Sequence, residues 1–536
     1  MECDCLRFAE IPQTTKLFAS YTENFAAVKQ FYGHAPDEAE VRAVAKEALL
    51  EADTRAAVLD VLREQNRWLG SDAETEKSID RLAKGAVAIV TGQQVGLFSG
   101  PAYSFYKALD AIRWAKKLTR AGVDAVPIFW LATEDHDLAE ANEVFFGERY
   151  GVARLEAPLD KQNEGRAVGR IALGSAIDAV VEHAIHLLEG PGKREIAEAL
   201  KVSYARGETF GSAFGKLFAR VFKGRGLILL DPLHKRLHEL ARPIYRKAME
   251  DAEAIGNDLV TRGKKLTRDG FHAQVKVTQQ STLLFLDVDG KREAVRRRNG
   301  GFVAGNLRLS ADELLRKIDE EPGALSAGVL LRPVLQDAIL PTAAYVGGPA
   351  EVAYMAQAEV VYRRVIGRMP AILPRASFTL LEPAVARALK KYGLTIRDVL
   401  GGRQGLRRKM EAEYLPRGLK ARFARDEKAL RKMLAGYGKA LGMLDKTLVG
   451  ARETAERKMF YQFEKLQRKA GRAENIRTGI LDRHELEIVS ALYPRHGLQE
   501  RTLCLLPFLA RCGMELLERL ESAMEKPCPG HRLLAL

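Results

Sequence analysis

The feature that most constrains the fold is a short apolar run that ends abruptly in glycine or polar residues. Residues 86–90 read Ala-Val-Ala-Ile-Val and lead into Thr91, and residues 126–131 lead into a cluster of acids. Runs this short and this apolar are typical of strands buried on both faces of a parallel sheet. Because residues 103–118 between them have helical spacing, we expect a strand, helix, strand unit with parallel pairing.

Three further runs repeat this pattern and extend the predicted sheet to five strands. They are residues 227–230, 342–346 and 371–373. Two stretches between the runs, at about 149–207 and 272–309, differ in texture and interrupt the alternation of strands and helices. The sequence therefore predicts an α/β fold with one parallel-sheet core and two insertions.

The C-terminal third has a different periodicity, which predicts a coiled coil. Apolar residues recur four and three positions apart, a spacing near 3.5 that keeps one seam facing a partner helix. They are Leu430, Leu434, Tyr437, Leu441, Leu444 and Leu448. Residues 401–475 hold 20 Lys and Arg against 9 Asp and Glu, and so carry most of the net charge of +14. We favour a solvated flank of a dimerising coil over an RNA-contacting arm, because aromatic and basic residues do not interleave there.

These patterns divide the chain into four segments. They are a helical lead-in at 1–84, the sheet core with its insertions at 85–380, a coiled-coil arm at 381–475, and C-terminal helices at 476–536 that pack back on the core.

The five cysteines lie only near the two ends of the chain, a layout that does not suggest a disulfide framework. They are Cys3, Cys5, Cys504, Cys512 and Cys528. Cys3 and Cys5 lack a second ligand pair nearby, so we predict no metal site. No apolar run reaches the roughly 18 residues that span a bilayer, and no secretion signal opens the chain, so we expect a cytoplasmic protein with no membrane partner.

In a parallel α/β sheet, ligands bind beyond the carboxyl ends of the strands, so the loops after the strands are the candidate sites. The loop after the first strand offers glycines for close backbone approach, hydroxyls, amides and a following helix N-terminus that favours anions. Its candidate ligand contacts are Thr91, Gly92, Gln93, Gln94, Gly96, Ser99, Gly100, Tyr103 and Lys107. The alternative is a tight turn in which the glycines serve geometry only.

The loop after the second strand holds the candidate catalytic residues Glu134, Asp135, His136 and Asp137. An imidazole beside carboxylates can act as a general base or hold a cation. The alternative is that the acids complement the dipole of a helix N-terminus and His136 has no role.

Two later loops add further binding candidates. Gly347, Gly348 and Pro349 precede a helix with Glu351 and Tyr354, and Arg375 follows the last core strand. Arg332 and Gln336 lie earlier in the chain; an arginine can hold a carboxylate or phosphate bidentately, or be a structural ion-pair partner instead. A Walker A loop, a dinucleotide fingerprint and a serine elbow are absent from the sequence, which argues against P-loop ATPases, nicotinamide dehydrogenases and α/β-hydrolases.

Several strings, in order along most of the chain, resemble one family: the bacillithiol biosynthesis cysteine-adding enzymes (BshC). They are Thr91-Gly92-Gln93-Gln94 with Gly96 and Gly100-Pro101, Trp130 with Glu134-Asp135-His136-Asp137, His272-Ala273-Gln274, Gly347-Gly348-Pro349 with Glu351 and Tyr354, and Leu498-Gln499-Glu500-Arg501 with Pro507. The resemblance implies a Rossmann-like core with connecting-peptide insertions and a C-terminal coiled coil that forms a homodimer. It also adds His272 and Gln274 to the substrate-binding candidates.

The activity implied by the resemblance is a ligase reaction that joins the carboxyl group of L-cysteine to the amine of glucosaminyl malate. Activation of a free carboxylate implies ATP, with Mg²⁺ as a candidate companion ion, although the HIGH and KMSKS signatures of class I synthetases are absent. The resemblance also suggests a nucleotide site, for ATP or ADP, near the start of the coiled coil. Its candidates are Phe378, Thr379, Gln499 and Arg501.

Our mechanistic hypothesis at this point places the ligands between the loops at 91–96 and 347–351. His136 or Asp137 would deprotonate the attacking amine, and Arg332 or Arg375 would hold the malyl carboxylates. Two rival functions stay open: a nucleotidyl-transferring or tRNA-handling enzyme, and a noncatalytic scaffold built on the coiled coil. Nucleic acid is the less favoured partner.

Overall fold

The computed structural model of the chain describes residues 4–159 and 161–536. The chain divides into two compact units, and α22 (Leu506–Cys512) and α23 (Glu515–Glu525) belong to the first. The first unit contains residues up to 146, 153–379 and 500–534, and the second contains 147–152, 380–499 and 535–536. The metal candidate Cys3 lies outside the described residues.

The core of the first unit is a five-stranded, all-parallel sheet in the order β13-β12-β2-β3-β6. The five strands are those predicted, each within a few residues of its expected position: β2 (Val87–Gln93), β3 (Ala125–Leu131), β6 (Ile228–Leu230), β12 (Thr342–Gly347) and β13 (Ala371–Pro374). Because every residue of β3 is buried, this strand has no polar face. The predicted Rossmann-like parallel sheet is thereby confirmed.

Helices cover the sheet and connect its strands. The connection from β2 to β3 is α5 (Tyr103–Arg120), whose buried face packs on both strands. The N-terminal segment is helical, as predicted: α1 (Lys16–Glu23), α2 (Glu38–Glu47), α3 (Ala52–Leu69) and α4 (Ala73–Ala83). The remaining helices of this unit up to β13 are α6 (Leu138–Ala141), α7 (Ile177–Leu187), α8 (Lys193–Ser203), α9 (Phe210–Val221), α10 (Lys235–Glu250), α11 (Ala252–Arg268), α12 (Ala311–Glu320), α13 (Arg332–Ile339) and α14 (Pro349–Val365).

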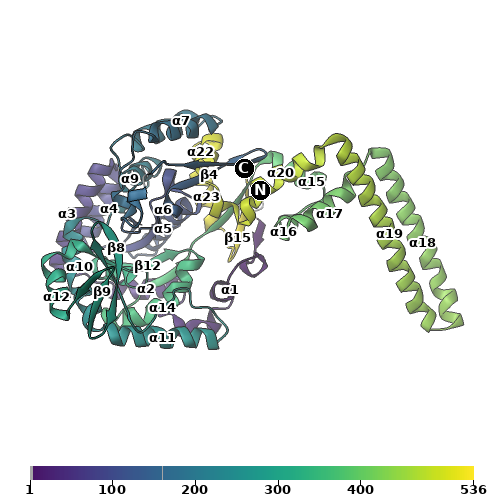
Figure 1. Cartoon of the computed structure of the whole chain (residues 1–536). Coiled ribbons are helices and arrows are strands. Elements are labelled where there is room, and N and C mark those ends of the chain that lie inside the picture. The colour runs from purple at the N-terminus through teal and green to yellow at the C-terminus, as the bar shows by residue number, and fades with distance from the viewer. Residues whose placement is uncertain (1–3, 160) are drawn as a thin grey trace. The chain divides into compact units, whose positions relative to one another are not determined.

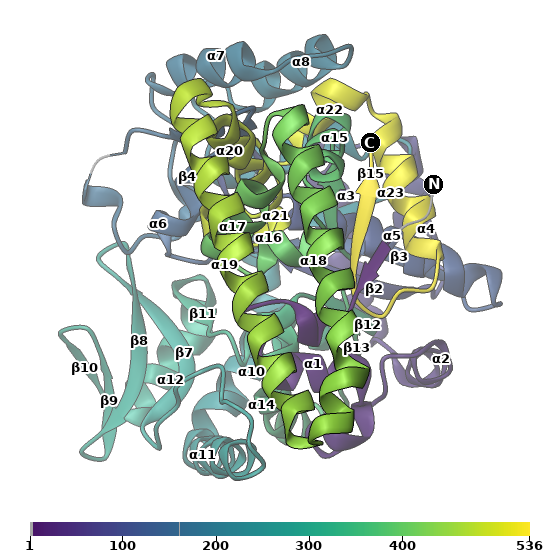
Figure 2. The same cartoon turned by 90° about the vertical axis from the view of Figure 1, so that its right-hand side faces the viewer.

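The second predicted insertion forms an antiparallel sheet of its own, in the order β10-β9-β8-β7-β11 (Figure 2). Its strands are β7 (Ser281–Val288), β8 (Lys291–Arg298), β9 (Gly301–Ala304), β10 (Leu307–Leu309) and β11 (Leu325–Ala327). A turn at residues 287–290 joins β7 and β8, and Asp287 Oδ1 accepts a hydrogen bond from Gly290 N at 2.8 Å. The first insertion holds the hairpin of β4 (Glu143–Glu148) and β5 (Gly151–Glu156), followed by α7 and α8.

The second unit contains a hairpin of two long helices, α18 (Arg417–Leu444) and α19 (Thr447–Thr478), which lie side by side (Figure 1). The predicted coiled coil is confirmed, and the chain turns at Asp445 between its two helices. The Asp445 carboxylate accepts hydrogen bonds from Thr447 N and Oγ1, at 2.8 and 2.9 Å, and so starts α19 afresh. The other helices of this unit are α15 (Pro383–Lys391), α16 (Ile396–Leu400), α17 (Arg403–Glu413) and α20 (Ile480–Leu492).

The two ends of the chain are linked covalently, which the sequence reasoning did not predict. The N-terminal strand β1 (Asp4–Leu6) pairs antiparallel with β15 (His531–Ala535), which is bonded in turn to β14 (Ser377–Leu381). Cys5 and Cys528 form a disulfide with their Cα atoms 6.0 Å apart. Sequence distance hid this pairing, because only the tertiary structure brings the two ends together. Cys504 is buried, as expected of a core residue, and Cys512 is partly exposed.

No helix within residues 4–159 and 161–536 is both long enough and apolar enough to cross a membrane.

Candidate functional site

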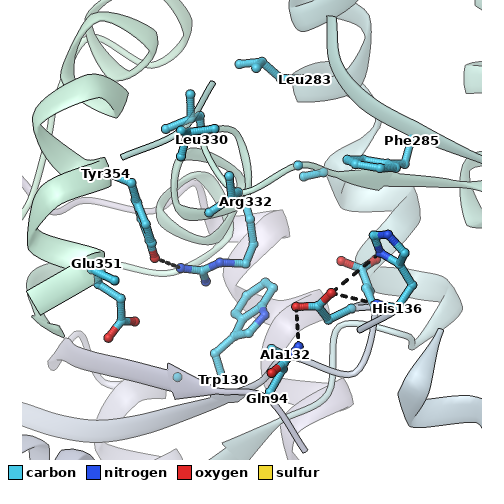
Figure 3. A pocket seen from close by; sticks show the side chains of 18 of the residues that line it. Gln94, Trp130, Ala132, His136, Leu283, Phe285, Leu330, Arg332, Glu351 and Tyr354 are labelled. Atoms are coloured by element: carbon cyan, nitrogen blue, oxygen red, sulfur yellow. Dashed lines mark hydrogen bonds and ion pairs between the residues drawn. The ribbon is translucent and has the colours of Figure 1, made fainter. Parts of the chain in front are cut away.

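A pocket of about 640 Å³ lies where the carboxyl ends of β2, β3 and β12 meet the antiparallel sheet of the insertion. This volume is typical of sites for small molecules and cofactors. Figure 3 shows Arg332 next to Trp130, with Tyr354 and Glu351 to one side and His136 and Phe285 to the other. All residues that line the pocket belong to the first unit.

Of the candidate site residues, the fold brings about half together on this pocket. Those that line it are Gly92, Gln93, Gln94, Tyr103, Lys107, Glu134, Asp135, His136, Arg332, Gly348, Glu351, Tyr354, Arg375 and Arg501. Those that do not are Thr91, Gly96, Ser99, Gly100, Asp137, His272, Gln274, Gln336, Gly347, Phe378, Thr379 and Gln499.

Several of the residues away from the pocket support its walls. Thr91 Oγ1 donates to Val346 O at 2.8 Å and so ties β2 to β12. Gln336 is buried and accepts a hydrogen bond from Arg332 Nη1 at 3.0 Å. The backbone of Ser99 has a positive φ of 73° inside the turn that leads to α5, where Gly100 has a φ of 64°. These residues shape the loop rather than contact a ligand.

Glycine is required at position 92 by the neighbouring strand. A Cβ there would lie 2.8 Å from Trp130 O and 3.0 Å from Trp130 Cβ. The next residue, Gln93, points to α5: its amide nitrogen donates to Tyr103 Oη at 3.2 Å, and its oxygen accepts from Lys107 Nζ at 2.8 Å. The glycine and the two glutamines of this loop therefore have different roles, because Gln94 instead donates to Asp135 at 2.8 Å.

Glu351 is the most strongly bonded carboxylate of the pocket. Its oxygens accept hydrogen bonds from Tyr345 Oη and Gly348 N, at 2.5 and 2.6 Å, and pair with Lys107 Nζ at 2.5 Å. Burial acts to raise the pKa of Glu351, but Lys107 and these hydrogen bonds together hold it below its usual range. Glu351 therefore stays ionised and holds the first turn of α14 to the glycine loop.

The second loop contains the residues predicted to supply the base, and the geometry disagrees with two of them. Asp137 caps α6, where its Oδ1 accepts from Glu140 N at 3.1 Å, and it does not reach the pocket. His136 Nδ1 lies 3.1 Å from Arg292 Nη1. Because a guanidinium only donates, Nδ1 must be the acceptor and Nε2 must carry the ring proton. Neither nitrogen of His136 then has a free lone pair, so its prediction as the base is corrected.

Glu134 differs from its neighbours because it is buried and weakly bonded. Its side chain is 12% exposed, and Glu134 Oε1 lies 3.5 Å from Nε2 of the buried His238 on α10. Burial raises the pKa of Glu134 to about 7; the Arg292 guanidinium opposes this shift and the nearby Asp231 adds to it. Burial also lowers the pKa of His238 to about 4, so that this imidazole is neutral at physiological pH.

The two candidate arginines differ in their free hydrogen-bonding capacity. Arg375 forms a bidentate pair with the buried Glu500, with distances of 2.7 and 3.0 Å, so the prediction that it holds a substrate carboxylate is corrected. Arg332 makes long contacts of 3.4 and 3.3 Å to the hydroxyls of Tyr345 and Tyr354. Apart from its bond to Gln336, the Arg332 guanidinium is therefore weakly held and has donors left for a ligand.

Three of the four residues predicted to bind a nucleotide are buried and already bonded inside the protein. Thr379 Oγ1 is hydrogen-bonded to His531 Nε2 at 2.8 Å. The Gln499 side chain is hydrogen-bonded to both the N–H and the carbonyl of Leu380. The backbone N–H of Phe378 donates to Glu500 at 2.9 Å. This placement contradicts their predicted role, because none offers a free polar side-chain atom to a ligand. Arg501 is exposed and lines the pocket.

The insertion supplies pocket residues that sequence reasoning missed. Arg292 donates to Ser326 Oγ and Ala327 O, both at 2.8 Å, and Lys276 and Arg296 are exposed cations on the same wall. Trp130 Nε1 is buried without a hydrogen-bond partner among the described residues. The basic run at 291–298 was the signal that could have identified this wall. No group of three His, Cys, Asp or Glu within the described ranges is placed to hold a metal ion.

Comparison with known proteins identifies the family of the chain. The family model "Bacillithiol biosynthesis BshC, N-terminal Rossmann-like domain" matches residues 1–376, and the model of the BshC C-terminal coiled-coil domain matches residues 378–536. Relatives named "Putative cysteine ligase BshC" include one from Koribacter versatilis, 42% identical over 99% of both chains. Others are from Solibacter usitatus, 36% identical over the full length of both, and from Salinibacter ruber, 32% identical over 97% of this chain and 96% of its own.

Proposed function

Since the chain belongs to the bacillithiol biosynthesis BshC family and is a ligase of that family, we propose that it joins the carboxyl of L-cysteine to the amine of glucosaminyl malate. The product of this condensation is an amide. The relatives are named for cysteine ligation, and glucosaminyl malate is the amine that the family resemblance of the sequence implies.

The observation that supports the proposal is that a carboxylate and an arginine line the same pocket. A weakly bonded carboxylate, Glu134, lies on one wall, and the guanidinium of Arg332 lies on another. Amide formation needs an acceptor for the proton that leaves the amine, and a malyl group needs a cation for its carboxylates. Arg332, rather than Arg375, is our choice for that cation.

We further propose that ATP activates the cysteine carboxyl, with Mg²⁺ accompanying its phosphates. Lys276, Arg296 and Arg501 line the pocket as exposed cations, and none of them forms an ion pair within the described residues. Unpaired cations on a pocket wall suit a polyphosphate, because phosphate oxygens take charge-assisted hydrogen bonds. This wall replaces Phe378, Thr379 and Gln499 as the nucleotide contact in our account.

The coiled-coil hairpin supports a homodimer. Several large apolar side chains of α18 and α19 are exposed in the single chain, including Met443 at 88%, Leu444 at 78% and Tyr437 at 54%. Apolar side chains at coiled-coil spacing are buried when a second coil packs on them. Sedimentation at micromolar concentration would show a dimer, and Tyr437→Glu with Leu444→Glu would give a monomer.

We place the enzyme in the cytoplasm, where a biosynthetic ligase meets its substrates.

The experiment that tests the function is mass-spectrometric detection of the thiol product. Purified protein is incubated with L-cysteine, glucosaminyl malate, ATP and Mg²⁺, and each component is omitted in turn. We expect product only in the complete mixture, and the release of AMP or ADP then identifies the activated acyl species. Lack of product under every condition contradicts the proposed substrates.

A further inference from the structure

We propose that Glu134 is the general base that accepts the amine proton, and that His238 is the residue that positions it. This inference deepens the proposed function and rests on it. Glu134 follows β3 directly, so the parallel sheet delivers its carboxylate to the edge where ligands bind. His238 lies behind it on α10 and does not line the pocket.

The other carboxylates of the pocket have structural duties or lie in water. Glu351 is fixed by Lys107, Tyr345 and Gly348, and Asp135 accepts from Gln94 and from the His136 backbone at 2.8 and 2.7 Å. Glu140 is exposed. A proton accepted by Glu351 would break a buried ion pair, which makes that carboxylate a poor base.

Glu134, in contrast, has free acceptor capacity. Its carboxylate accepts no hydrogen bond from the described part of the chain, and its contact with His238 Nε2 is long at 3.5 Å. Its pKa of about 7 matches the best range for a base that works near neutral pH. Glu134 is therefore mostly buried, lines the pocket and is able to exchange a proton.

The two ring nitrogens of His238 have different surroundings. Its Nδ1 faces Tyr245 Oη at 3.5 Å, and its buried Nε2 makes no hydrogen bond of good geometry among the described residues. The backbone of Leu325 and of Pro322 lies close enough to act on the pKa of the ring, in the direction that raises it. A buried polar atom without a partner is costly, so a function or a ligand-bound state normally accounts for it. Contacts of this kind tighten when the substrate excludes water. We infer that Nε2–H then donates to Glu134 and directs its second oxygen into the pocket.

The chemical step balances with these residues. The amine nitrogen attacks the acyl carbon of cysteine activated by a nucleoside triphosphate, as an acyl phosphate or acyl adenylate. The C–N bond forms, and the bond from the acyl carbon to the phosphate oxygen breaks with its electron pair on the leaving phosphate. The amine proton goes to Glu134, which later returns it to water. Arg332 takes no proton in this scheme.

The groups that face Glu134 set the pH at which it works. They come from five segments and are Arg170, Asp231, His238, Tyr245, Arg292 and Arg332. His238 is neutral at physiological pH, so it contributes a dipole and not a charge. Its replacement by a hydrocarbon removes a donor from the carboxylate and raises the pKa of Glu134 further.

The test compares variants in the assay of the thiol product. Glu134→Gln, which keeps the shape and removes the proton acceptor, should lower kcat at least about 100-fold with KM for glucosaminyl malate within a few-fold. Glu293→Gln is the matched control: it lies on β8 next to Arg292 but does not line the pocket, and should leave kcat unchanged. His238→Leu should move the acid limb of the kcat profile, which reports the substrate complex, upward by about one pH unit. His238→Gln should restore part of this shift.

The outcomes separate the inference from the function. If wild-type protein forms product and Glu134→Gln keeps its kcat, Glu134 is not the base although the ligase activity stands. If the acid limb in His238→Leu does not move or moves downward, His238 does not position the base. A wild-type enzyme that forms no product contradicts the proposed substrates themselves. In that case the protonation of Glu134 can be followed by the infrared band of its carboxylic acid, which is identified because Glu134→Gln removes it. A band that disappears well below pH 7 overturns the inference.

Discussion

Glu134 and Glu351 line the same pocket but have opposite environments. Glu351 follows the glycine loop after β12 and is held by a lysine, a phenol and a backbone N–H, which keep its pKa low. Glu134 follows β3, has a neutral imidazole at 3.5 Å, and has its pKa raised by burial to about 7. Two carboxylates at one sheet edge can thus be a fixed charge and a proton acceptor, because their partners differ.

The difference also separates stability from activity. Glu351 contributes to the fold through its partners. Ionised Glu134 is a mostly buried charge that Arg170, Arg292 and Arg332 offset only in part, so it destabilises the folded state. A group kept at a cost in stability is expected at a functional site. Four experiments follow, each of which breaks or sharpens this comparison.

The largest loss of stability is expected on substitution of a third carboxylate, Glu500, which is fully buried in an ion pair. Its side chain is 1% exposed and forms the bidentate pair with Arg375. Glu500→Gln leaves the guanidinium buried without a counter-charge, and we expect a loss of about 4 kcal/mol in the free energy of unfolding. Chemical denaturation measures this loss. A loss below about 1 kcal/mol would show that water reaches the pair.

Glu351→Gln should cost somewhat less, about 3 kcal/mol, because Lys107 keeps two oxygen partners, Gly92 O and Gln93 Oε1. The sign of its pH dependence follows from the low pKa. The contribution of Glu351 is present above the unfolded-state pKa and is lost as the pH falls through the folded-state pKa. Thermal melting of both proteins from pH 7 to pH 3 should therefore show their midpoints converging on acidification. Midpoints that stay equally far apart at pH 3 would contradict the fixed-charge role.

Arg332→Gln tests the arginine that we propose binds the malyl carboxylates. Arg332 has one hydrogen bond of ordinary length, to Gln336 Oε1 at 3.0 Å, and long contacts to Tyr345 and Tyr354, so the fold should lose about 1 kcal/mol. We expect KM for glucosaminyl malate to rise about tenfold, which corresponds to roughly 1.4 kcal/mol, with kcat within a few-fold. Initial-rate kinetics test this expectation. An unchanged KM would remove Arg332 from malyl recognition.

The parallel sheet could be predicted from the sequence because a strand buried on both faces is apolar at every position. The runs at 86–90 and 126–131 are apolar throughout, and their ends mark the edge where the pocket lies. The turn after Leu444 was missed because the heptad spacing continues through Leu448, and only the cap at Asp445 shows the break.

The roles of the site residues were less predictable, because they depend on residues distant in sequence. His136 loses its free lone pair to Arg292, and Glu134 gains its neighbour from α10. Arg375 is occupied by Glu500, and Cys5 finds Cys528 from the opposite end of the chain. Motif strings place such residues at the right edge of the sheet, but partners brought in by tertiary structure decide which of them can exchange a proton.

The most direct test of the account is the difference in thermal midpoint between wild type and Glu134→Gln as a function of pH. A folded-state pKa of about 7 lies above the unfolded value, so the stability of the wild type relative to this variant is full below the unfolded pKa and is lost as pH rises through 7. The account predicts similar midpoints near pH 5 and a more stable variant at pH 8.5, by about 1 to 2 kcal/mol once access of water to the pocket is allowed for. A variant that is less stable than wild type at pH 8.5 would show that Glu134 is a fixed structural charge like Glu351, and would contradict the account.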